Sequence, residues 1–273
     1  MKDNALVQEL SEKARIVRRD IVQMIHKSGT AGHYGGSLSC ADILTCLYFH
    51  TLKLDPRNPR WDDRDRFVLS KGHAAPALYA VLLEAGYFSR DHLSTFKRMG
   101  SILQGHPDMK VTPGVEMSTG SLGQGLSVAL GMALAGRLDR KGYRVYVLLG
   151  DGEIEEGSVW EAAMAASHYG LDNLSAILDR NCLQISGSTE ECMRLEPLVD
   201  KWRSFGWDVV PIDGHDMAQI LAALRHTAGV KGKPSLIIAQ TVKGRGIQFL
   251  ENKPESHSCS LSDEEYRQVM RSL

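Results

Sequence analysis

The chain has 273 residues, of which 43% are hydrophobic and 24% are charged, and its formal net charge at pH 7 is −1. These are values of an ordinary globular protein, and they exclude an electrostatic case for binding nucleic acid or a membrane surface. The N-terminal segment is charged throughout and no apolar run approaches a membrane span, so we expect a cytoplasmic protein. The five cysteines match no zinc-binding spacing and are expected to be free thiols.

The first half of the sequence predicts mainly helices, separated by loops that are rich in glycine and proline. Residues 4–27 carry apolar side chains at helical spacing and predict an amphipathic helix. The elements expected next, in chain order, are a helix from Ser39 or Ala41 to about Tyr48, a strand at residues 66–70, helices at 75–85 and 91–98, an irregular segment at 102–117, and a long helix at 122–140. Small residues on that long helix would allow another element to approach closely, either within the domain or from another subunit.

The second half alternates strands and helices. The expected elements are strands at residues 143–149, 175–179, 208–212 and 235–241, with helices at 161–169, 197–204, 217–227 and a last short one opened by Ser262. This alternation predicts an α/β fold: a three-layer sandwich with a mainly parallel, doubly wound sheet. No linker is long enough to separate two domains, so we expect one domain over residues 1–273, with a peripheral C-terminal segment at about 251–273.

The most informative motif is the Gly-flanked Asp151, which is followed thirty positions later by Asn181. The motif begins directly after the strand expected at residues 143–149, and Asn181 follows the strand at residues 175–179. The two side chains should therefore lie past the carboxyl ends of neighbouring parallel strands, where ligands bind in open α/β sheets. A carboxylate, an amide oxygen and a nearby backbone carbonyl suit Mg²⁺, with Ca²⁺ or Mn²⁺ as substitutes, held against a diphosphate.

This arrangement is similar to the thiamine diphosphate signature, and the chain as a whole resembles the N-terminal, diphosphate-binding part of transketolase. The matching segments, in chain order, are GHYGGSLS at residues 32–39, LSKGHA at 69–74, GHP at 105–107, TGSLGQG at 119–125, GDGE at 150–153, EGSVWEA at 156–162, Asn181, and KGRG at 243–246. The resemblance covers about residues 10–257 and implies the thiamine diphosphate-binding fold.

The resemblance also implies a set of cofactor-binding residues. The implied metal ligands are Asp151, Asn181 and the carbonyl of Leu183. The implied contacts to thiamine diphosphate are His73, Gly120, Ser121, Leu122, Gly150, Asp151, Gly152, Glu153, Asn181, Lys243 and His257. Residues 120–122 stand at the start of a predicted helix, where backbone N–H groups favour anions. Cationic and N–H donors at the other positions would offset the charge that a divalent ion leaves uncompensated.

Four residues are implied to take part in catalysis. His33, His73 and His106 resemble the cluster around the reacting carbon, where histidines donate to substrate hydroxyls or carry protons. Histidine suits this work because its ordinary pKa lies near neutrality. Glu156 resembles the acid that links paired active sites. For the other histidines, and for His215 in a turn before a helix, we expect ordinary surface or core positions.

The resemblance implies one subunit of a two-chain transketolase, which would transfer a two-carbon ketol unit from a ketose or ketose phosphate to an aldose or aldose phosphate. The glutamate that protonates the aminopyrimidine ring in the family, and the basic residues that grip a sugar phosphate, lie in the part of transketolase that this chain does not match. A partner chain with the pyrimidine-binding and C-terminal domains is therefore expected, with two copies of each chain. Tyr34 stands where the family often has proline, and residues 251–259 lack the family's usual Trp-His-Gly context.

Two alternatives remain open from the sequence. One is a component of another thiamine diphosphate enzyme, such as a keto-acid dehydrogenase or a deoxyxylulose-phosphate synthase. The combined His33, His73 and His106 motifs argue against it. The other is a non-catalytic subunit that binds the cofactor, and the retained Asp151 and Asn181 argue against that.

Overall fold

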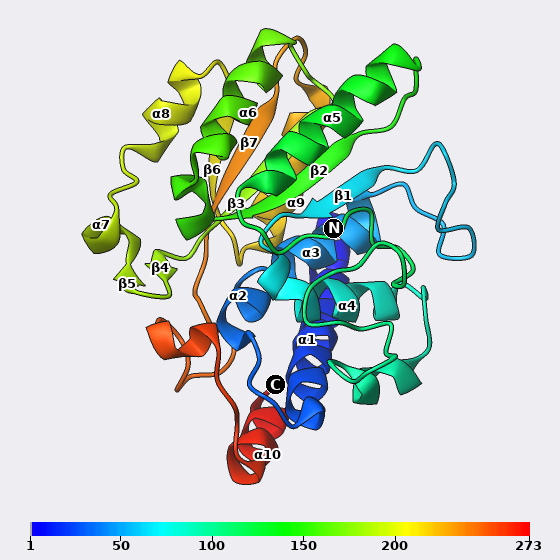
Figure 1. Cartoon of the computed structure of the whole chain (residues 1–273), viewed down its shortest axis with the longest axis vertical. Coiled ribbons are helices and arrows are strands. Elements are labelled where there is room, and N and C mark those ends of the chain that lie inside the picture. The colour runs from blue at the N-terminus through cyan, green and yellow to red at the C-terminus, as the bar shows by residue number, and fades with distance from the viewer. Residues whose placement is uncertain (1) are drawn as a thin grey trace.

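The computed structural model describes residues 2–273, with side chains from residue 4 onward. Its centre is a five-stranded sheet in the order β1-β2-β3-β7-β6, drawn in Figure 1. The strands are β1 (Arg66–Leu69), β2 (Val145–Gly150), β3 (Leu174–Arg180), β6 (Asp208–Asp213) and β7 (Ser235–Gln240). Every neighbouring pair is parallel, so the carboxyl ends of all five strands lie along one edge of the sheet.

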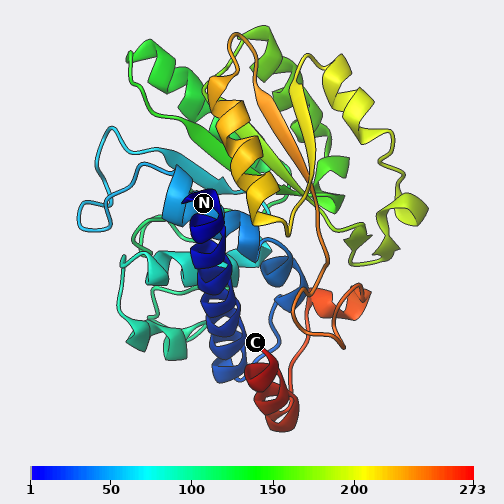
Figure 2. The same ribbon diagram turned by 180° about the vertical axis from the view of Figure 1, so that it is seen from behind.

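Helices cover both faces of this sheet. Helices α5, α6 and α8 lie on one face, and α9 with α1, α3 and α4 lie on the other, as the two opposite views show (Figures 1 and 2). The helices are α1 (Lys2–Ser28), α2 (Tyr34–Ser39), α3 (Ala41–Cys46), α4 (Ala75–Glu84), α5 (Gln124–Leu138), α6 (Gly157–His168), α7 (Thr189–Cys192), α8 (Leu198–Ser204), α9 (Met217–Gly229) and α10 (Asp263–Ser272). The expected three-layer α/β sandwich is confirmed.

The sheet is apolar on both sides because alternate strand residues serve different cores. In β2, Val145, Val147 and Leu149 pack into the core under α5 and α6, whereas Tyr146 and Leu148 pack into the core on the other face. Successive side chains of a strand point to opposite faces, so a strand buried on both sides is a continuous apolar run. That run was the sequence signal for this strand.

Some elements differ from the sequence prediction. The second predicted helix is α3 followed by a π-helical turn (Leu47–Thr51), and α2, just before it, was not predicted. The helix predicted at residues 91–98 is a 3-10 helix (Arg90–Thr95). Helix α6 begins four residues earlier than predicted. A hairpin of β4 (Leu183–Gln184) and β5 (Gly187–Ser188), followed by α7, was not predicted. Such short elements carry too few residues for a periodic pattern.

The small residues of α5 pack within the chain. Gly125, Ala129, Ala133 and Gly136 are all buried. A Cβ atom on Gly125 would lie 2.2 Å from the hydroxyl oxygen of Ser70, so the helix approaches the end of β1 too closely for any side chain there. The structure therefore decides between the two alternatives that the sequence left open for this face of the helix: it meets the sheet, not another subunit.

The C-terminal segment packs against the start of the chain. Helix α10 begins with a capping box between Ser262 and Glu265, so Ser262 opens this helix as predicted. The ring of Tyr266 stacks on His26 of α1, with 4.0 Å between the ring centroids. Within residues 2–273, no helix combines the length and the hydrophobicity needed to cross a membrane.

Candidate functional site at the carboxyl edge of the sheet

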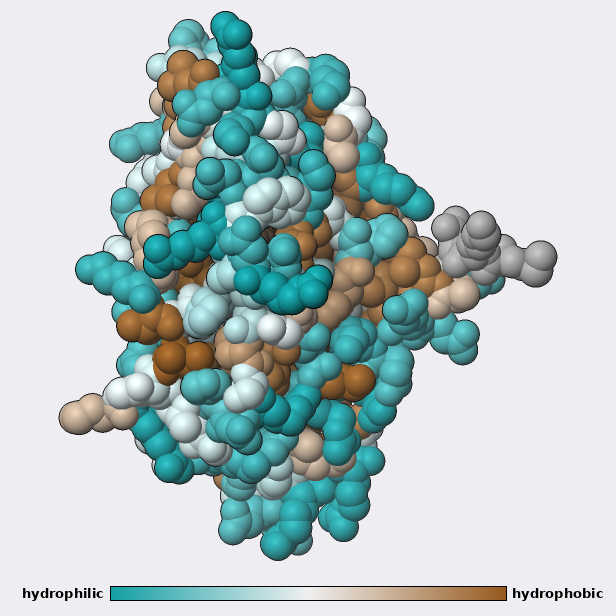
Figure 3. All heavy atoms as spheres, turned by 90° about the vertical axis from the view of Figure 1, so that its right-hand side faces the viewer, coloured by the Kyte–Doolittle hydropathy of each residue, from teal (hydrophilic) through white to brown (hydrophobic). Residues whose placement is uncertain are grey.

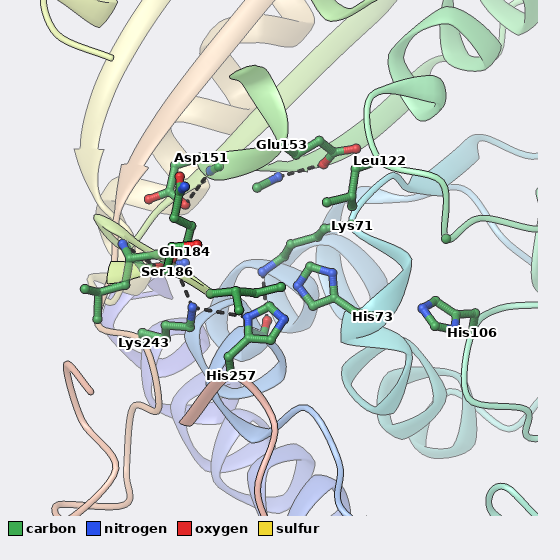
Figure 4. Close-up of a pocket in the computed structure, with 17 residues that line it drawn as sticks. Lys71, His73, His106, Leu122, Asp151, Glu153, Gln184, Ser186, Lys243 and His257 are labelled. Atoms are coloured by element: carbon green, nitrogen blue, oxygen red, sulfur yellow. Dashed lines mark hydrogen bonds between the residues drawn. The ribbon is translucent and has the colours of Figure 1, made fainter. Parts of the chain in front are cut away.

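A cleft of about 380 Å³ opens at the carboxyl ends of the strands (Figure 4). Its wall contains most of the residues that the sequence singled out: His73, His106, Gly120, Leu122, Gly150, Asp151, Gly152, Glu153, Asn181, Leu183, Lys243 and His257. It also contains residues that the sequence reasoning did not name: Gly36, Lys71, Gln184, Ile185 and Ser186. Segments that are far apart in the sequence thus meet at one edge of the sheet.

The oxygen-bearing side chains of Asp151 and Asn181 line this cleft. Asp151 directly follows β2 and Asn181 directly follows β3, and these two strands are parallel neighbours, as predicted. The carboxylate of Asp151 accepts the N–H groups of Gly152 at 2.9 Å and of Cys182 at 2.5 Å. Burial, with the nearby Asp179, raises the pKa of Asp151 to about 6. The amide nitrogen of Asn181 faces Asp179 at 3.5 Å.

Two lysines bring positive charge into the cleft. The ammonium of Lys243 donates to the carbonyl of Leu183 at 3.0 Å and lies 3.4 Å from Nδ1 of His257. Burial lowers the pKa of Lys243 to about 8. Lys71 is fully buried, donates to the carbonyl of Gly36 at 2.7 Å and forms an ion pair with Asp179. Both cations can face an anionic ligand, and Lys71 was missed although it stands in the LSKGHA motif.

Asp179 is the buried carboxylate on which several segments converge. It accepts hydrogen bonds from Lys71, from Ser39 at 2.5 Å and from Thr241. Because these donors come from three other segments of the chain, Asp179 ties α2, the end of β1 and the end of β7 to β3. Asp179 is the acidic residue of the strand predicted at residues 175–179, and the sequence analysis gave it no role.

Four histidines form a cluster beside these charges. The ring centroid of His33 lies 5.3 Å from those of His73 and His257, and 6.3 Å from that of His106. The centroids of His73 and His257 are 5.1 Å apart. The cluster therefore unites residues from four segments, and the resemblance had assigned three of its members to catalysis and His257 to the cofactor. His33 is half-buried and does not line the cleft itself.

The environment keeps these imidazoles neutral. Burial, together with the charge of nearby lysines, lowers the pKa of His33 and of His257 to about 4. Burial and the ammonium of Lys97 lower the pKa of His106, and burial holds the pKa of His73 well below its ordinary value. At neutral pH each ring is therefore able both to donate and to accept one hydrogen bond.

The C-terminal segment positions two of these histidines. Gly32 and Cys259 form an antiparallel bridge, in which each N–H donates to the carbonyl of the other residue at 2.9 and 3.1 Å. His33 is next to Gly32, and His257 is two residues before Cys259. This pairing brings both rings together from opposite ends of the chain.

The carboxylate of Glu153 is occupied by hydrogen bonds from the protein itself. Its carboxylate accepts hydrogen bonds from the N–H groups of Gly123 and Gly150, both at 2.9 Å, and from the hydroxyl of Ser70. The side chain joins the ends of β1 and β2 to the turn before α5, and it is 2% exposed. The sequence reasoning had placed Glu153 among the cofactor contacts, and its observed hydrogen bonds hold the cleft wall together.

Three of the predicted residues lie outside the cleft wall: His33, which is described above, Ser121 and Glu156. Ser121 is exposed in the turn before α5, and Glu156 is exposed at the start of α6. Gly123 has a positive φ of 84°, and a Cβ atom there would lie 2.7 Å from that of Glu156. The glycine therefore lets the turn approach Glu156 closely. His215, which we expected to be structural, bonds Asp42 at 2.8 Å and accepts the N–H of Val242 at 2.9 Å, away from the cleft.

Comparisons with known proteins identify the family of this chain. The family model described as "Transketolase, thiamine diphosphate binding domain" matches residues 7–273. The chain belongs to this family. It is a transketolase-type domain for thiamine diphosphate, and its relatives divide into separate subunits and longer chains.

Among the separate subunits is the 6-deoxy-6-sulfo-D-fructose transketolase subunit SqwG of Clostridium sp. (strain MSTE9), which is 48% identical over 97% of this chain and 96% of its own length. One subunit of the apulose-4-phosphate transketolase of Phocaeicola vulgatus is 46% identical over 98% of this chain and 94% of its own length. A crystal structure of transketolase from Campylobacter jejuni superposes with a TM-score of 0.92 at 36% identity, over 97% of this chain. The chain spans only 42% of that longer transketolase.

Proposed function

We propose that this chain is the N-terminal subunit of a two-chain transketolase, which transfers a two-carbon ketol unit from a ketose to an aldose. The observation that carries the proposal is a single cleft lined by Asp151, Asn181 and Lys243 together with His73, His106 and His257. The ring of His33 lies beside the rings of these three histidines. Relatives that match this chain over almost their whole length are named as transketolase subunits, which supports a separate partner chain.

The residues at the strand ends fit thiamine diphosphate and a divalent ion, which we propose to be Mg²⁺. The described residues contain no group of three or more His, Cys, Asp and Glu side chains that could hold a metal by themselves. Asp151, the amide oxygen of Asn181 and the carbonyl of Leu183 instead offer hard oxygen atoms, and a diphosphate would supply the remaining ligands. The positive charges of Lys243 and Lys71 would balance the negative charge of the diphosphate. Gly120 and Leu122 line the same cleft.

When it is bound, the cofactor supplies the nucleophilic carbon and the electron sink for cleavage of a carbon–carbon bond. We propose that the chain's own part is to hold substrate hydroxyls and to move protons. The rings of His73 and His106 both lie near that of His33, and all three rings are neutral. Each ring can therefore donate a hydrogen bond to one substrate oxygen and accept one from another. His257 and Lys243 would hold the end of the site nearer the diphosphate.

The partner would carry the pyrimidine-binding and C-terminal domains, and we propose an assembly of two copies of each chain. Glu156 is exposed beside the cofactor turn, as an acid that links two active sites across a chain boundary would be. On the face that Figure 3 shows, hydrophobic side chains gather in several groups between hydrophilic ones. We propose that residues 1–273 form one domain, with residues 251–273 as a peripheral segment that holds His33 and His257 in place.

The test is reconstitution of the pair. The chain would be co-purified with the product of a neighbouring reading frame that resembles the rest of transketolase, and ketol transfer would be followed from a ketose donor to an aldose acceptor. We expect activity only with both chains, thiamine diphosphate and a divalent ion present. Asp151→Ala should abolish metal-dependent cofactor binding without unfolding the chain. The matched control is Asp139→Ala, at an exposed position after α5.

An active chain without a partner would contradict the two-chain proposal. Wild-type activity of Asp151→Ala with the usual metal would contradict the assigned ligand. Formation of a decarboxylated or deoxyxylulose product instead of ketol transfer would place the chain in another class of thiamine diphosphate enzyme.

A further inference from the structure

Arg180 is a buried cation in direct contact with the carboxylate at the centre of the proposed metal site. It is the last residue of β3 and is 2% exposed. One terminal nitrogen, Nη1, lies 3.4 Å from Oδ2 of Asp151 and donates to the hydroxyl of Thr189 at 2.6 Å. The strand end and these partners hold the charge beside Asp151.

The other end of the guanidinium points toward the surface. Its second terminal nitrogen, Nη2, donates to Glu190 at 2.8 Å and to Glu196 at 3.3 Å. The side chains of these two glutamates are 33% and 50% exposed, so water screens their charges. Asp151 is only 3% exposed at its side chain. The guanidinium is therefore shared between one buried carboxylate and two carboxylates near the surface.

The fully buried charges around the cleft are equal in number before any ligand enters. The buried cations are Lys71, Arg180 and Lys243, and the buried carboxylates are Asp151, Glu153 and Asp179. A divalent ion against Asp151 would meet the repulsion of Arg180 at short range. The negative charges of Glu190 and Glu196 lie nearer the surface, where water screens them. A diphosphate would bring its own negative charge with it.

We propose that Arg180 makes divalent-metal binding at Asp151 depend on the diphosphate, by competing for this carboxylate when the metal comes alone. The inference rests on the proposed function, which assigns Asp151 to the metal. Arg180 acts through Asp151 and is thus a positioning residue. If Arg180 were only structural, its replacement would lower the affinity for the metal alone, because loss of a structural residue would weaken the metal site. The proposal predicts that this affinity rises.

The experiment measures Mn²⁺ binding to the full chain by electron paramagnetic resonance, with and without thiamine diphosphate. Arg180→Met and Arg180→Gln remove the charge, and the second keeps hydrogen-bond donors. We expect either variant to bind Mn²⁺ alone about tenfold more tightly than wild type, because a unit charge a few ångströms away is removed. Arg180→Lys, which keeps the charge, should stay close to wild type. Unchanged or weaker binding of Mn²⁺ alone in both neutral variants would overturn the proposal.

A surface variant tests the same idea without touching the buried charge. When Glu190 and Glu196 are both replaced by glutamine, two of the three ion pairs that Arg180 forms in residues 2–273 are lost. The ion pair with Asp151 remains. We expect this pair of substitutions to weaken binding of Mn²⁺ alone, and tighter or unchanged binding would contradict the proposal. If wild type fails to bind Mn²⁺ even with thiamine diphosphate, the assigned metal site is wrong. If it binds with the cofactor but the Arg180 variants do not differ, only the role of Arg180 is wrong.

Discussion

The buried ion pair between Lys71 and Asp179 offers a quantitative test of how the floor of the cleft is held. Lys71→Met keeps most of the side-chain volume but leaves Asp179, which is fully buried, without its counter-charge. Breaking such a pair from one side costs about 3–5 kcal/mol. Ser39 and Thr241 still donate to Asp179, so we expect the lower end, about 3 kcal/mol.

Urea denaturation of the full chain measures this loss, and the double variant with Asp179→Asn separates the pair from its surroundings. Because the double variant leaves no unpaired charge, we expect it to be less destabilised than the sum of the single variants, by about 1–3 kcal/mol. The control is Lys141→Met in the exposed pair with Asp63, which should leave the midpoint unchanged. A loss below about 1 kcal/mol for Lys71→Met would refute the reasoning, because a buried carboxylate without a counter-charge should cost more than that.

Four further predictions concern the ligand, the histidines and the packing. The chain alone should bind thiamine diphosphate weakly and the reconstituted pair tightly, and equal affinities in calorimetry would argue against a site shared between chains. His33→Ala and His106→Ala should lower turnover by about 10²–10⁴ but spare cofactor binding, and normal kcat in both variants would remove them from catalysis. The depressed pKa values of His33 and His257, about 4, mean that the unfolded chain binds more protons between that pH and about 6.5. Stability should therefore fall as the pH drops through this window, and asparagine at both positions should flatten the profile measured by thermal melting. Ala133→Trp should destabilise the chain itself, because Ala133 is fully buried on the inner face of α5, and a variant that melts like wild type while failing to pair would contradict this.

The sequence by itself determined the sheet and the two residues at its edge. The strand before Asp151 and the strand before Asn181 are local apolar runs, and parallel strands in such a fold have their carboxyl ends together. One helix start was also determined locally, at Ser262 with its capping box. These features depend on spacing over a few residues, and that information lies within the segment itself.

Only the tertiary structure decided which charges meet. Lys71 and Asp179 pair across 108 positions. The carboxylate of Glu153 accepts hydrogen bonds from the turn before α5 and from the ends of two strands. Gly32 and Cys259 pair from opposite ends of the chain and bring His33 beside His257. The physical reason is that a buried polar group is stable only with a partner, and the partner is set by which surfaces pack together rather than by the residues next to it in the sequence.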